Sequence, residues 1–313
     1  MTGNTFYFNW EVDCMIWLQA HLGTIGTSIA KVFTFFGEEL VFVVIFGILY
    51  WCLDKKAAKT IGIPLVIALI VNPMIKNIAL RRRPYLDHSG IRCLKPVTSK
   101  ADITDIAAQG YSFPSAHAMN SVIIYGGLYS LVQNRIIRAL TVILPVLVGL
   151  SRVALGVHYT TDVLAGWGLG LLILFLAPYV QKNVKNENLF HLIVFLVSAT
   201  GIFFCRTDDY FAGLGVMAGL FLAIPFEERF VSFEGTNNIA AGVLRVAAGF
   251  ALEAGLSYLT KMPFSKDFLE RGTLSANLVR SARYTVIMFI LFAIYPMLFK
   301  YIDRVFRKPD AGS

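Results

Sequence analysis

Long apolar runs constrain this chain more than any other feature of its sequence. Nine runs are apolar over most of their length, near residues 39–53, 60–80, 115–132, 136–152, 160–180, 188–205, 209–225, 238–260 and 282–301. A helix of about 20 mostly apolar residues is long enough to cross the hydrocarbon core of a bilayer. The runs therefore predict an all-α protein, a polytopic transmembrane helical bundle.

Polar residues interrupt this pattern in three places. Residues 9–36 are apolar but broken by polar groups, and we expect a membrane-associated helix there. Two long polar stretches, 81–113 and 261–281, separate groups of apolar runs. Such segments are where loops outside the bilayer are expected.

Composition narrows the class of protein further. The chain of 313 residues is 56% hydrophobic and only 15% charged, whereas soluble domains have about 25% charged residues. Its net charge of +8 suits contact with anionic lipid or phosphate. No basic stripe interleaved with aromatic residues lies outside the apolar runs, so we expect no nucleic-acid partner. The sequence gives no indication of oligomeric state.

The sequence also indicates which helix ends face the cytoplasm. If all nine runs cross, the loops 54–59, 133–135 and 181–187 lie on one side, and each carries Lys or Arg. Short basic loops mark the cytoplasmic side. The loop 81–113 then faces away from the cytoplasm, although it is itself basic.

His158 and Asp162 stand out in the apolar segment LGVHYTTDVLAG. Residues four apart share one face of a helix. A carboxylate that orients a histidine and raises its basicity recurs in nucleophilic and acid–base sites. The alternative is a satisfied polar pair near the start of a helix.

Two further polar clusters accompany this pair at the ends of other apolar runs. In KNIALRRRPY, Lys76 precedes Arg83 by seven residues, which places both on one helix face. In YSFPSAHAMNS, Ser115 and His117 follow Pro114 at the start of a run, and Arg152 ends the run before His158. By the alternation above, all these groups lie on the same side of the membrane. Three cations, a hydroxyl and the amides of a helix N-terminus form an anion-binding cradle.

Each cluster also has a structural interpretation. Lys76 could extend to the membrane interface, and Arg81–Arg83 could form a lipid-facing basic cluster. The PSAH segment could be an ordinary helix start, and Arg152 could pair with Asp105. The agreement of spacing, order and side favours a functional site, because ionisable groups at a membrane are costly.

Together the three clusters resemble the motifs of the type-2 phosphatidic acid phosphatase superfamily. Lys76, Arg83 and Pro84 match the first motif, K-x6-R-P. The third motif, S-R-x5-H-x3-D, is matched by Ser151, Arg152, His158 and Asp162. The second, P-S-G-H, is matched by residues 114–117 except that Ala116 replaces glycine, which restricts the backbone more.

The resemblance implies a covalent mechanism. His158 attacks phosphorus and forms a phosphohistidine, and Asp162 holds its ring in the required tautomer. His117 protonates the leaving alkoxide and then activates water. The phosphoryl oxygens are bound by the cradle residues, Lys76, Arg83, Ser115, Ala116 and Arg152. No metal or other cofactor is needed, because three cations supply the electrostatic stabilisation.

The resemblance also implies an organisation and a substrate class. Most members have a six-helix core, and here additional helices follow the last motif. We expect an N-terminal membrane-associated helix over 1–38, a catalytic transmembrane core over 39–205 and additional transmembrane helices over 206–313. This layout resembles the branch of the sphingosine-phosphate phosphatases and glucose-6-phosphatase. We predict an integral membrane enzyme that hydrolyses a lipid phosphate monoester, with its active site on the non-cytoplasmic side.

Other functions remain open at this point. The phosphoryl group could pass to a lipid or sugar hydroxyl, or the substrate could be a polyprenyl diphosphate. A transporter is disfavoured because its site would lie in broken helices at the midplane, and a catalytically inactive scaffold because the motif set is intact. The soluble vanadate-dependent haloperoxidases resemble the same core but not this composition.

The C-terminal half contains one further charged pair. Arg245 and Glu253 lie eight residues apart on roughly one face of the run 238–260. They are candidate head-group contacts. A polar contact between helices is the favoured alternative, because charges in membranes usually pair within a bundle.

Overall fold

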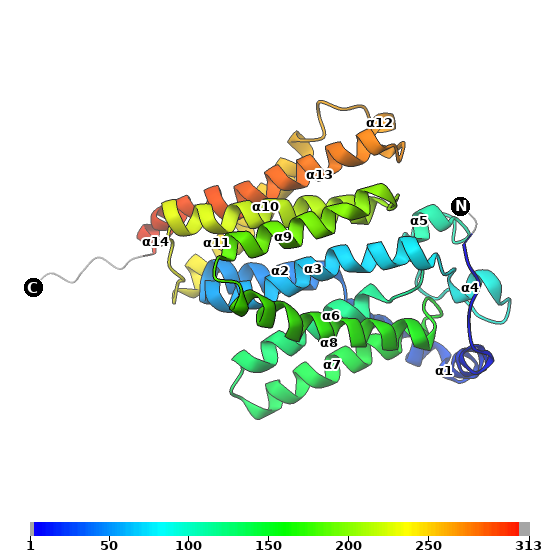
Figure 1. The fold of residues 1–313 in the computed structure, drawn as a ribbon. Coiled ribbons are helices and arrows are strands. Elements are labelled where there is room, and N and C mark those ends of the chain that lie inside the picture. The colour runs from blue at the N-terminus through cyan, green and yellow to red at the C-terminus, as the bar shows by residue number, and fades with distance from the viewer. Residues whose placement is uncertain (1–2, 307–313) are drawn as a thin grey trace, which may run out of the picture. The chain divides into compact units, whose positions relative to one another are not determined.

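The computed structural model describes residues 3–306, and Figure 1 shows their helical fold. Apart from an isolated β-bridge between Asn4 and Arg81, the regular elements of these residues are helices. The longer ones are α1 (Asn9–Phe35), α2 (Glu39–Ile48), α3 (Lys55–Ala79), α6 (Ala116–Leu131), α7 (Arg135–Ala154), α8 (Thr160–Asn183), α9 (Glu187–Ala199), α10 (Asp208–Phe230), α11 (Ile239–Leu259) and α13 (Leu274–Phe289). The short ones are α4 (Pro84–Asp87), α5 (Ile106–Gln109), α12 (Lys266–Glu270) and α14 (Phe299–Val305), with π turns at Leu49–Leu53 and Ile290–Ile294 and 3₁₀ turns at Thr200–Phe203 and Tyr295–Leu298.

The predicted transmembrane helical bundle is confirmed, but with fewer long helices than expected. Within residues 3–306, six helical segments are long and apolar enough to cross a membrane: α3, α7, α8, α10, α11 and the continuous stretch Leu274–Val305. A seventh is added if α1 and the segment Glu39–Leu53, bent by 41°, count as one broken span. The condition that all nine runs cross separately is therefore not met by length and composition. The runs near 39–53, 115–132 and 188–205 form helices too short to meet that length.

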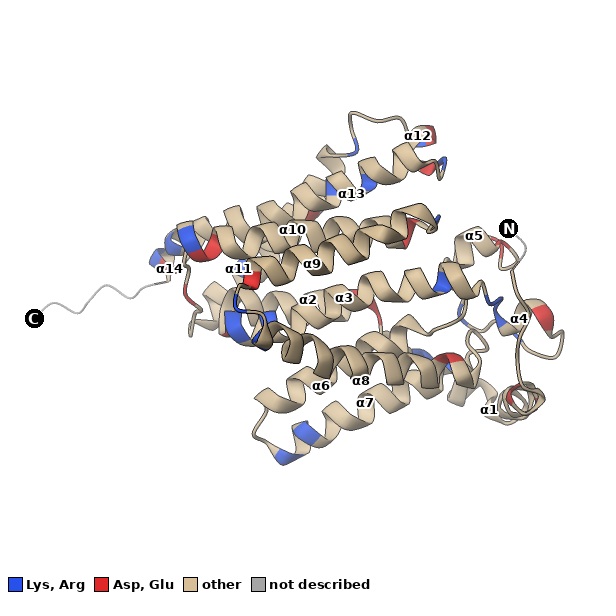
Figure 2. Cartoon of the chain, in the orientation of Figure 1, with Lys and Arg blue, Asp and Glu red and all other residues tan. Residues whose placement is uncertain are grey.

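Charged residues lie toward the ends of the long helices. Figure 2 shows extended uncharged stretches along α8 and α10 between charged ends. In α8 the charges are Asp162 in the first turn and Lys182 in the last. A helix with an uncharged middle and charged ends suits a bilayer, where a central charge is costly.

The chain forms two compact units. Unit 1 comprises the described residues up to Phe42 together with Ile63–Asn183 and Phe203–Thr207, and unit 2 comprises the remainder. Unit 1 thus combines α1 with the helices that carry the sequence motifs. The division into 1–38, 39–205 and 206–313 stays a prediction.

Close helix packing in unit 1 depends on two glycines of α8. A Cβ atom on Gly166 would lie 2.6 Å from the carbonyl oxygen of Ser115, and one on Gly170 would lie 2.6 Å from that of Met119. These separations are shorter than any real contact, so only glycine lets α8 lie this close to α6. The first turns of the two helices are thereby held side by side.

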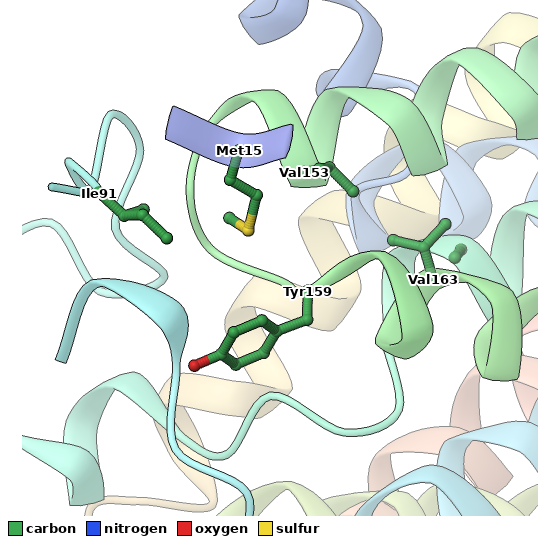
Figure 3. Packing of buried hydrophobic residues seen from close by; sticks show 6 residues of the cluster. Met15, Ile91, Val153, Tyr159 and Val163 are labelled. Carbon is green, nitrogen blue, oxygen red and sulfur yellow. The ribbon is translucent and has the colours of Figure 1, made fainter. Parts of the chain in front are cut away.

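A buried apolar cluster holds the motif-bearing segments together (Figure 3). It contains residues from α1, the 81–113 loop, α6, α7 and α8, namely Met15, Ile91, Ala118, Val153, Tyr159 and Val163. Burial of such side chains is the main favourable contribution to their association. The cluster therefore positions the segments that carry the three motifs, and it attaches α1 to them.

Unit 2 has its own packed interior. Helix α10 lies against α13, where a Cβ on Gly215 would lie 2.3 Å from the carbonyl oxygen of Ser281. Aromatic rings continue this interior, with Trp51 stacked on Phe292 at 5.5 Å between ring centroids. As in unit 1, small residues let the helices of unit 2 lie close together, and apolar side chains fill its interior.

Candidate active site

The motif residues all lie in unit 1, at the ends of its helices. Lys76 is in the last turn of α3, and Arg83 immediately precedes α4. Ser115 is the N-cap of α6, Arg152 is in the last turn of α7, and Asp162 is in the first turn of α8. His158 lies in the connection between α7 and α8. Residues far apart in sequence are thus brought to one set of helix ends.

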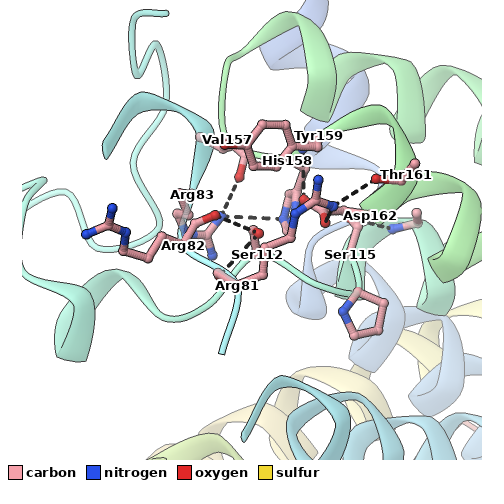
Figure 4. A network of polar contacts seen from close by, with 12 residues as sticks. Arg81, Arg82, Arg83, Ser112, Ser115, Val157, His158, Tyr159, Thr161 and Asp162 are labelled. Atoms are coloured by element: carbon pink, nitrogen blue, oxygen red, sulfur yellow. Dashed lines mark hydrogen bonds and ion pairs between the residues drawn. The ribbon is translucent and has the colours of Figure 1, made fainter. Parts of the chain in front are cut away.

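The His158 ring has a different group at each nitrogen (Figure 4). Its Nδ1 lies 3.4 Å from Oδ2 of Asp162, and its Nε2 lies 3.4 Å from Nη1 of Arg83. The ring is only 2% exposed. Both separations exceed the usual 2.7–3.2 Å of an N–H···O hydrogen bond, and catalytic hydrogen bonds are often long before substrate binds. The arrangement orients Nδ1 toward a carboxylate and Nε2 toward a cation.

The surroundings of His158 favour its neutral form. Burial lowers the pKa of His158 well below 6.5, and nearby positive charge lowers it further. The charges responsible belong to Arg83, Arg152, Lys76 and His117. A neutral imidazole has a free lone pair, which a nucleophile requires.

Asp162 is held by several groups besides the histidine. It is fully buried, and its Oδ1 accepts a hydrogen bond from Nη1 of Arg81 at 2.6 Å. Its Oδ2 accepts the backbone N–H of Tyr159 at 2.8 Å, and its carbonyl oxygen accepts the N–H of Ser115 at 2.9 Å. His158 and Asp162 therefore do not lie on one continuous helix, as their spacing had predicted. His158 precedes α8, and Asp162 accepts a hydrogen bond from the backbone of the α7–α8 connection that carries His158.

A glycine shapes this connection. Gly156 has φ +77°, and a Cβ there would lie 2.2 Å from the carbonyl oxygen of Arg92. Other residue types rarely adopt such a conformation. The turn at Gly156 ends α7 after Arg152 and brings His158 back toward the site.

Arg83 is fixed by backbone carbonyls. Its Nε donates to the carbonyl oxygens of Gln109 and Gly110, each at 3.0 Å, and its Nη1 donates to that of Val157 at 2.8 Å. The guanidinium is 2% exposed. The 81–113 loop thus holds Arg83 beside Nε2 of His158.

Arg152 has one donor that forms a hydrogen bond and another that is not used within the described residues. Its Nη1 donates to Oγ1 of Thr34 at 2.7 Å, and the residue is 2% exposed. Within the described residues 3–306, its buried Nε has no hydrogen-bond partner. Buried donors are almost always satisfied, so the expected partner is a group outside these residues, such as a water molecule or an anion.

The start of α6 places the second motif. Ser115 is fully buried and its Oγ caps α6 at Ala118, with N···O 3.5 Å. Ala116 and His117 form the first turn that follows. A Cβ on Gly37 would lie 3.2 Å from Cδ2 of His117, so the small residue at the α1–α2 turn leaves room for the ring. The amides of this turn point out of the helix start, where anions bind.

Four residues that contact the site were not predicted to be part of it. Arg81 was considered a member of a lipid-facing cluster, yet it is 1% exposed and bonds Asp162. Glu11, Thr34 and Thr161 also contact site residues. The one available signal was a carboxylate at Glu11 in an otherwise apolar segment, since such groups are costly unless they have a role.

Arg245 and Glu253 belong to unit 2, whereas the other candidates belong to unit 1. Arg245 is 1% exposed, and its Nη1 donates to the carbonyl oxygens of Trp51 and Glu234 at 2.6 and 3.0 Å. Its Nη2 pairs with Asp303 at 2.5 Å. These contacts favour a polar link between segments of unit 2 over a head-group contact for Arg245. Glu253 is half-buried in α11.

Two family models match separate parts of the chain. Residues 57–186 match the PAP2 superfamily. Residues 211–304 match a second model, described as a PAP2 superfamily phosphatase, transmembrane extension. The first contains all three motifs, and the second covers helices that follow them.

Individual proteins show the same likeness. The chain is 31% identical to an undecaprenyl-diphosphatase of Sulfolobus acidocaldarius over 47% of this chain and 67% of that protein. It is 40% identical to phosphatidylglycerophosphatase B of Bacillus subtilis over 24% of this chain, a match spanning only 42% of that relative. A crystal structure of a transmembrane PAP2-type phosphatidylglycerolphosphate phosphatase from Bacillus subtilis aligns with TM-score 0.42 and 24% identity, over 57% of this chain and 90% of that one.

The family models and the named relatives confirm the superfamily inferred from the motifs but correct the branch. The relatives found carry the names of a phosphatidylglycerophosphatase and undecaprenyl-diphosphatases, not of sphingosine-phosphate phosphatases or glucose-6-phosphatase. The extra helices that suggested that branch match the PAP2 transmembrane extension instead. A count of helices after the motifs was too weak a feature to specify the branch.

Proposed function

Because the chain belongs to the PAP2 superfamily of transmembrane phosphatases, we propose that it hydrolyses a lipid phosphate monoester through a phosphohistidine at His158. The observation that carries this proposal is the setting of that ring. Its Nδ1 faces Asp162 and its Nε2 faces Arg83, each at 3.4 Å. One nitrogen is thus oriented by a carboxylate while the other is directed to where a phosphate would bind.

In the first step, Nε2 of His158 attacks phosphorus and the bond to the lipid oxygen breaks. Asp162 stabilises the positive charge that develops on the ring. Arg83 and Arg152 stabilise the charge on the phosphoryl oxygens, and the Nε of Arg152, which has no partner among residues 3–306, supports that role. His117 gives a proton to the leaving alkoxide. Burial and the neighbouring cations lower the pKa of His117, so His117 takes up this proton together with the phosphate, whose negative charge offsets those cations. Lys76 adds positive charge, as its effect on the pKa of His158 indicates.

In the second step, a water molecule attacks the phosphohistidine. His117, now neutral, accepts a proton from that water. The N–P bond breaks, His158 regains its lone pair, and inorganic phosphate leaves. The amides at Ala116 and His117, with Ser115, offer the phosphoryl oxygens further donors at a helix start.

A lipid substrate is supported by the position of the site. The motif residues lie at the ends of helices that are apolar along most of their length. A phosphate head reaches such a site while its lipid chain stays among the helices and the bilayer. The names of the relatives point to two head groups, a glycerophosphate monoester and a polyprenyl diphosphate. The second is the alternative substrate class.

The active site is further proposed to face away from the cytoplasm. Three motif-bearing helices have basic residues at the opposite end: Lys55 begins α3, Arg135 begins α7, and Lys182 lies in the last turn of α8. Short basic loops are typical of the cytoplasmic side. Labelling of single cysteines introduced at Thr98 and Lys185 in intact cells tests this orientation. Labelling of the first alone by an impermeant reagent is expected, and the reverse result contradicts it.

Phosphate release by the detergent-purified protein tests the reaction. The panel consists of phosphatidylglycerol phosphate, phosphatidate, sphingosine phosphate, undecaprenyl diphosphate and glucose 6-phosphate. His158→Ala is the inactive variant, and His21→Ala, on an exposed position of α1, is the matched control. We expect release from one or more lipid monoesters, lost in His158→Ala and retained in His21→Ala.

Other outcomes separate the alternatives. Release from undecaprenyl diphosphate alone supports the diphosphatase alternative. No release, together with base-stable labelling of His158 by a radioactive phosphate donor, supports transfer to an acceptor hydroxyl. No release and no labelling in a folded protein contradicts the proposed function.

A further inference from the structure

Glu11 of α1 is a fully buried carboxylate inside unit 1. Its Oε1 accepts hydrogen bonds from the backbone N–H and the hydroxyl of Thr161, both at 2.7 Å. Its Oε2 accepts from the N–H of Phe8 at 3.0 Å and from Nη2 of Arg81 at 3.2 Å. Four donors thus converge on this carboxyl group, and both of its oxygens act as acceptors.

Arg81 joins this carboxylate to Asp162. Its Nη1 donates to Oδ1 of Asp162 at 2.6 Å and to the hydroxyl of Thr161 at 2.8 Å, while Nη2 faces Glu11. Its Nε donates to the carbonyl oxygen of Phe6 at 2.8 Å, and its guanidinium lies 4.0 Å from the ring centroid of Tyr159. One buried cation is thus shared by two buried carboxylates.

We propose that Glu11 is a positioning residue of the phosphoryl-transfer site, acting through Arg81 and Thr161 to orient Asp162 and to preserve its negative charge for His158. Glu11 lies outside residues 57–186, which match the family model. The inference rests on the proposed function, since it concerns how the same site works. It makes α1 a part of the catalytic unit.

The physical reason is the sharing of one positive charge. A guanidinium at 2.6 Å from Asp162 neutralises much of the field that this carboxylate exerts on His158. A second carboxylate on the other side of Arg81 restores net negative charge to the group of three. Interactions between buried charges are little screened, so the loss of Glu11 changes the field at His158. Asp162 would then stabilise the charged ring less in the transition state.

Several charged groups face His158, and the test must separate Glu11 from them. The carboxylate is Asp162, and the groups that contribute positive charge are Arg83, Arg152, Lys76 and His117. None of these contacts Glu11 directly among the hydrogen bonds of the described residues, where Arg81, Thr161 and Phe8 are its partners. A variant at Glu11 therefore leaves the phosphate-binding groups in place.

The experiment compares Glu11→Gln with Asp13→Asn. Asp13 lies on the same helix but is exposed, so its variant carries the same change in charge without touching the network. For Glu11→Gln we expect kcat to fall by roughly 10–100-fold, the range for partners of a ligating or reacting residue, with KM changed less than about 3-fold. The acid limb of kcat/KM should move to lower pH by about 0.5 unit. Asp13→Asn should match the wild type in both.

A second variant separates positioning from attachment of α1. Gln19 holds the same helix by donating to the carbonyl oxygens of Arg92 and Ala154 at 2.9 and 3.2 Å. Gln19→Ala should lower the thermal midpoint without moving the acid limb. If Glu11→Gln folds in low yield, the labelled fraction of His158 gives the concentration of folded sites, and kcat is calculated on that basis.

The outcomes are distinct. If the wild-type protein has no activity on any lipid phosphate, the proposed function is contradicted. That result is distinct from one that overturns the role of Glu11, which requires an active wild type. An active wild type with Glu11→Gln equal to it in kcat and in acid limb overturns the inference. A fall in activity per folded site without any shift of the acid limb, matched by Gln19→Ala, also overturns it, because attachment of α1 would then explain the loss.

Discussion

Arg81 lies closer to the Asp162 carboxylate than His158 does. The Nη1–Oδ1 separation is 2.6 Å, whereas the Nδ1–Oδ2 separation is 3.4 Å. The carboxylate is therefore anchored to a buried cation and to the N–H of Tyr159, and the histidine ring is set against an already fixed acceptor. A preorganised partner of this kind avoids reorganisation during the reaction.

Substitution of Asp162 by Asn should abolish most of the activity. Asn keeps the shape but not the charge, so Nδ1 of His158 loses its anionic partner. We expect kcat to fall by roughly 10²–10⁴-fold, as for the orienting aspartate of other histidine sites, with a smaller change in KM. Steady-state phosphate release is the measurement. Asp267→Asn, at an exposed position of α12, is the control, and similar kcat values for both variants would contradict the orienting role.

The pH dependence should follow the ionisation of His158. Its pKa is lowered well below 6.5 by burial and by the positive charge of its neighbours. The neutral nucleophile therefore persists as the pH falls past 6.5, and the acid limb of kcat/KM should lie below that value. The unfolded chain binds this proton near 6.5 and the native state does not, so stability should fall as the pH decreases from 6.5. The expectation would be contradicted if the acid limb of kcat/KM lay at or above pH 6.5 and the profile of kcat showed no such limb.

Arg152 should not be replaceable by lysine. A guanidinium offers donors in a planar fork, one of which bonds Thr34 while the Nε has no partner among residues 3–306. Lysine cannot reproduce that geometry. Arg152→Lys should lower kcat/KM by roughly 10²–10³-fold and weaken inhibition by orthovanadate in parallel. Arg138→Lys, in the first turn of the same helix, should change neither, and retained vanadate inhibition in Arg152→Lys would remove Arg152 from the binding site.

Replacement of Ala116 by glycine should have little effect on catalysis. Ala116 is the first residue of α6 and is not among the described residues with positive φ, so the site does not need glycine's conformational freedom there. Ala116→Gly should change kcat/KM by less than about 3-fold and lower the stability by at most about 1 kcal/mol. Thermal melting and phosphate release check this. A large gain in activity would show that the methyl group obstructs the substrate.

Gly156 should be intolerant of any side chain. Its φ of +77° and a Cβ position 2.2 Å from the carbonyl oxygen of Arg92 leave no room for alanine. Gly156→Ala should displace the connection that carries His158, lowering both the thermal midpoint and kcat. Gly168→Ala, where a Cβ would meet nothing within 4 Å, should leave both unchanged. Equal behaviour of the two variants would mean that the Gly156 turn does not position the nucleophile.

The motif residues could be identified from the sequence because their residue types recur in short, ordered patterns, and their catalytic roles stay a prediction. The His158 ring lies 3.4 Å from both Asp162 and Arg83, and Ser115 and Arg152 lie at helix ends. The four-residue spacing predicted the first of these contacts, whereas no spacing in the sequence indicates the second. The superfamily followed from those patterns alone. Apolar length likewise predicted the helical bundle.

What the sequence did not reveal depends on tertiary contact. Nothing local in RRRP distinguishes Arg81, which bonds Asp162, from a lysine or arginine at a membrane surface. The role of Glu11 requires α1 to pack beside α7 and α8, and no periodicity encodes which helix packs where. The bounds of α6 and α9 were close to those of the apolar runs, since α6 (Ala116–Leu131) fills the run 115–132 and α9 with its 3₁₀ turn fills most of the run 188–205. Both are nevertheless too short to meet the length of a full crossing.

The buried link between Glu11 and Arg81 bears on how enzymes of this superfamily are recombined. A chimera joined at residue 57, where the family model begins, would pair Arg81 with a foreign leading helix. It would leave that cation with one carboxylate instead of two, and Thr161 without its acceptor. The smallest interchangeable part of this enzyme therefore starts before α1, and exchanges of substrate specificity should carry the leading helix together with the motifs it supports.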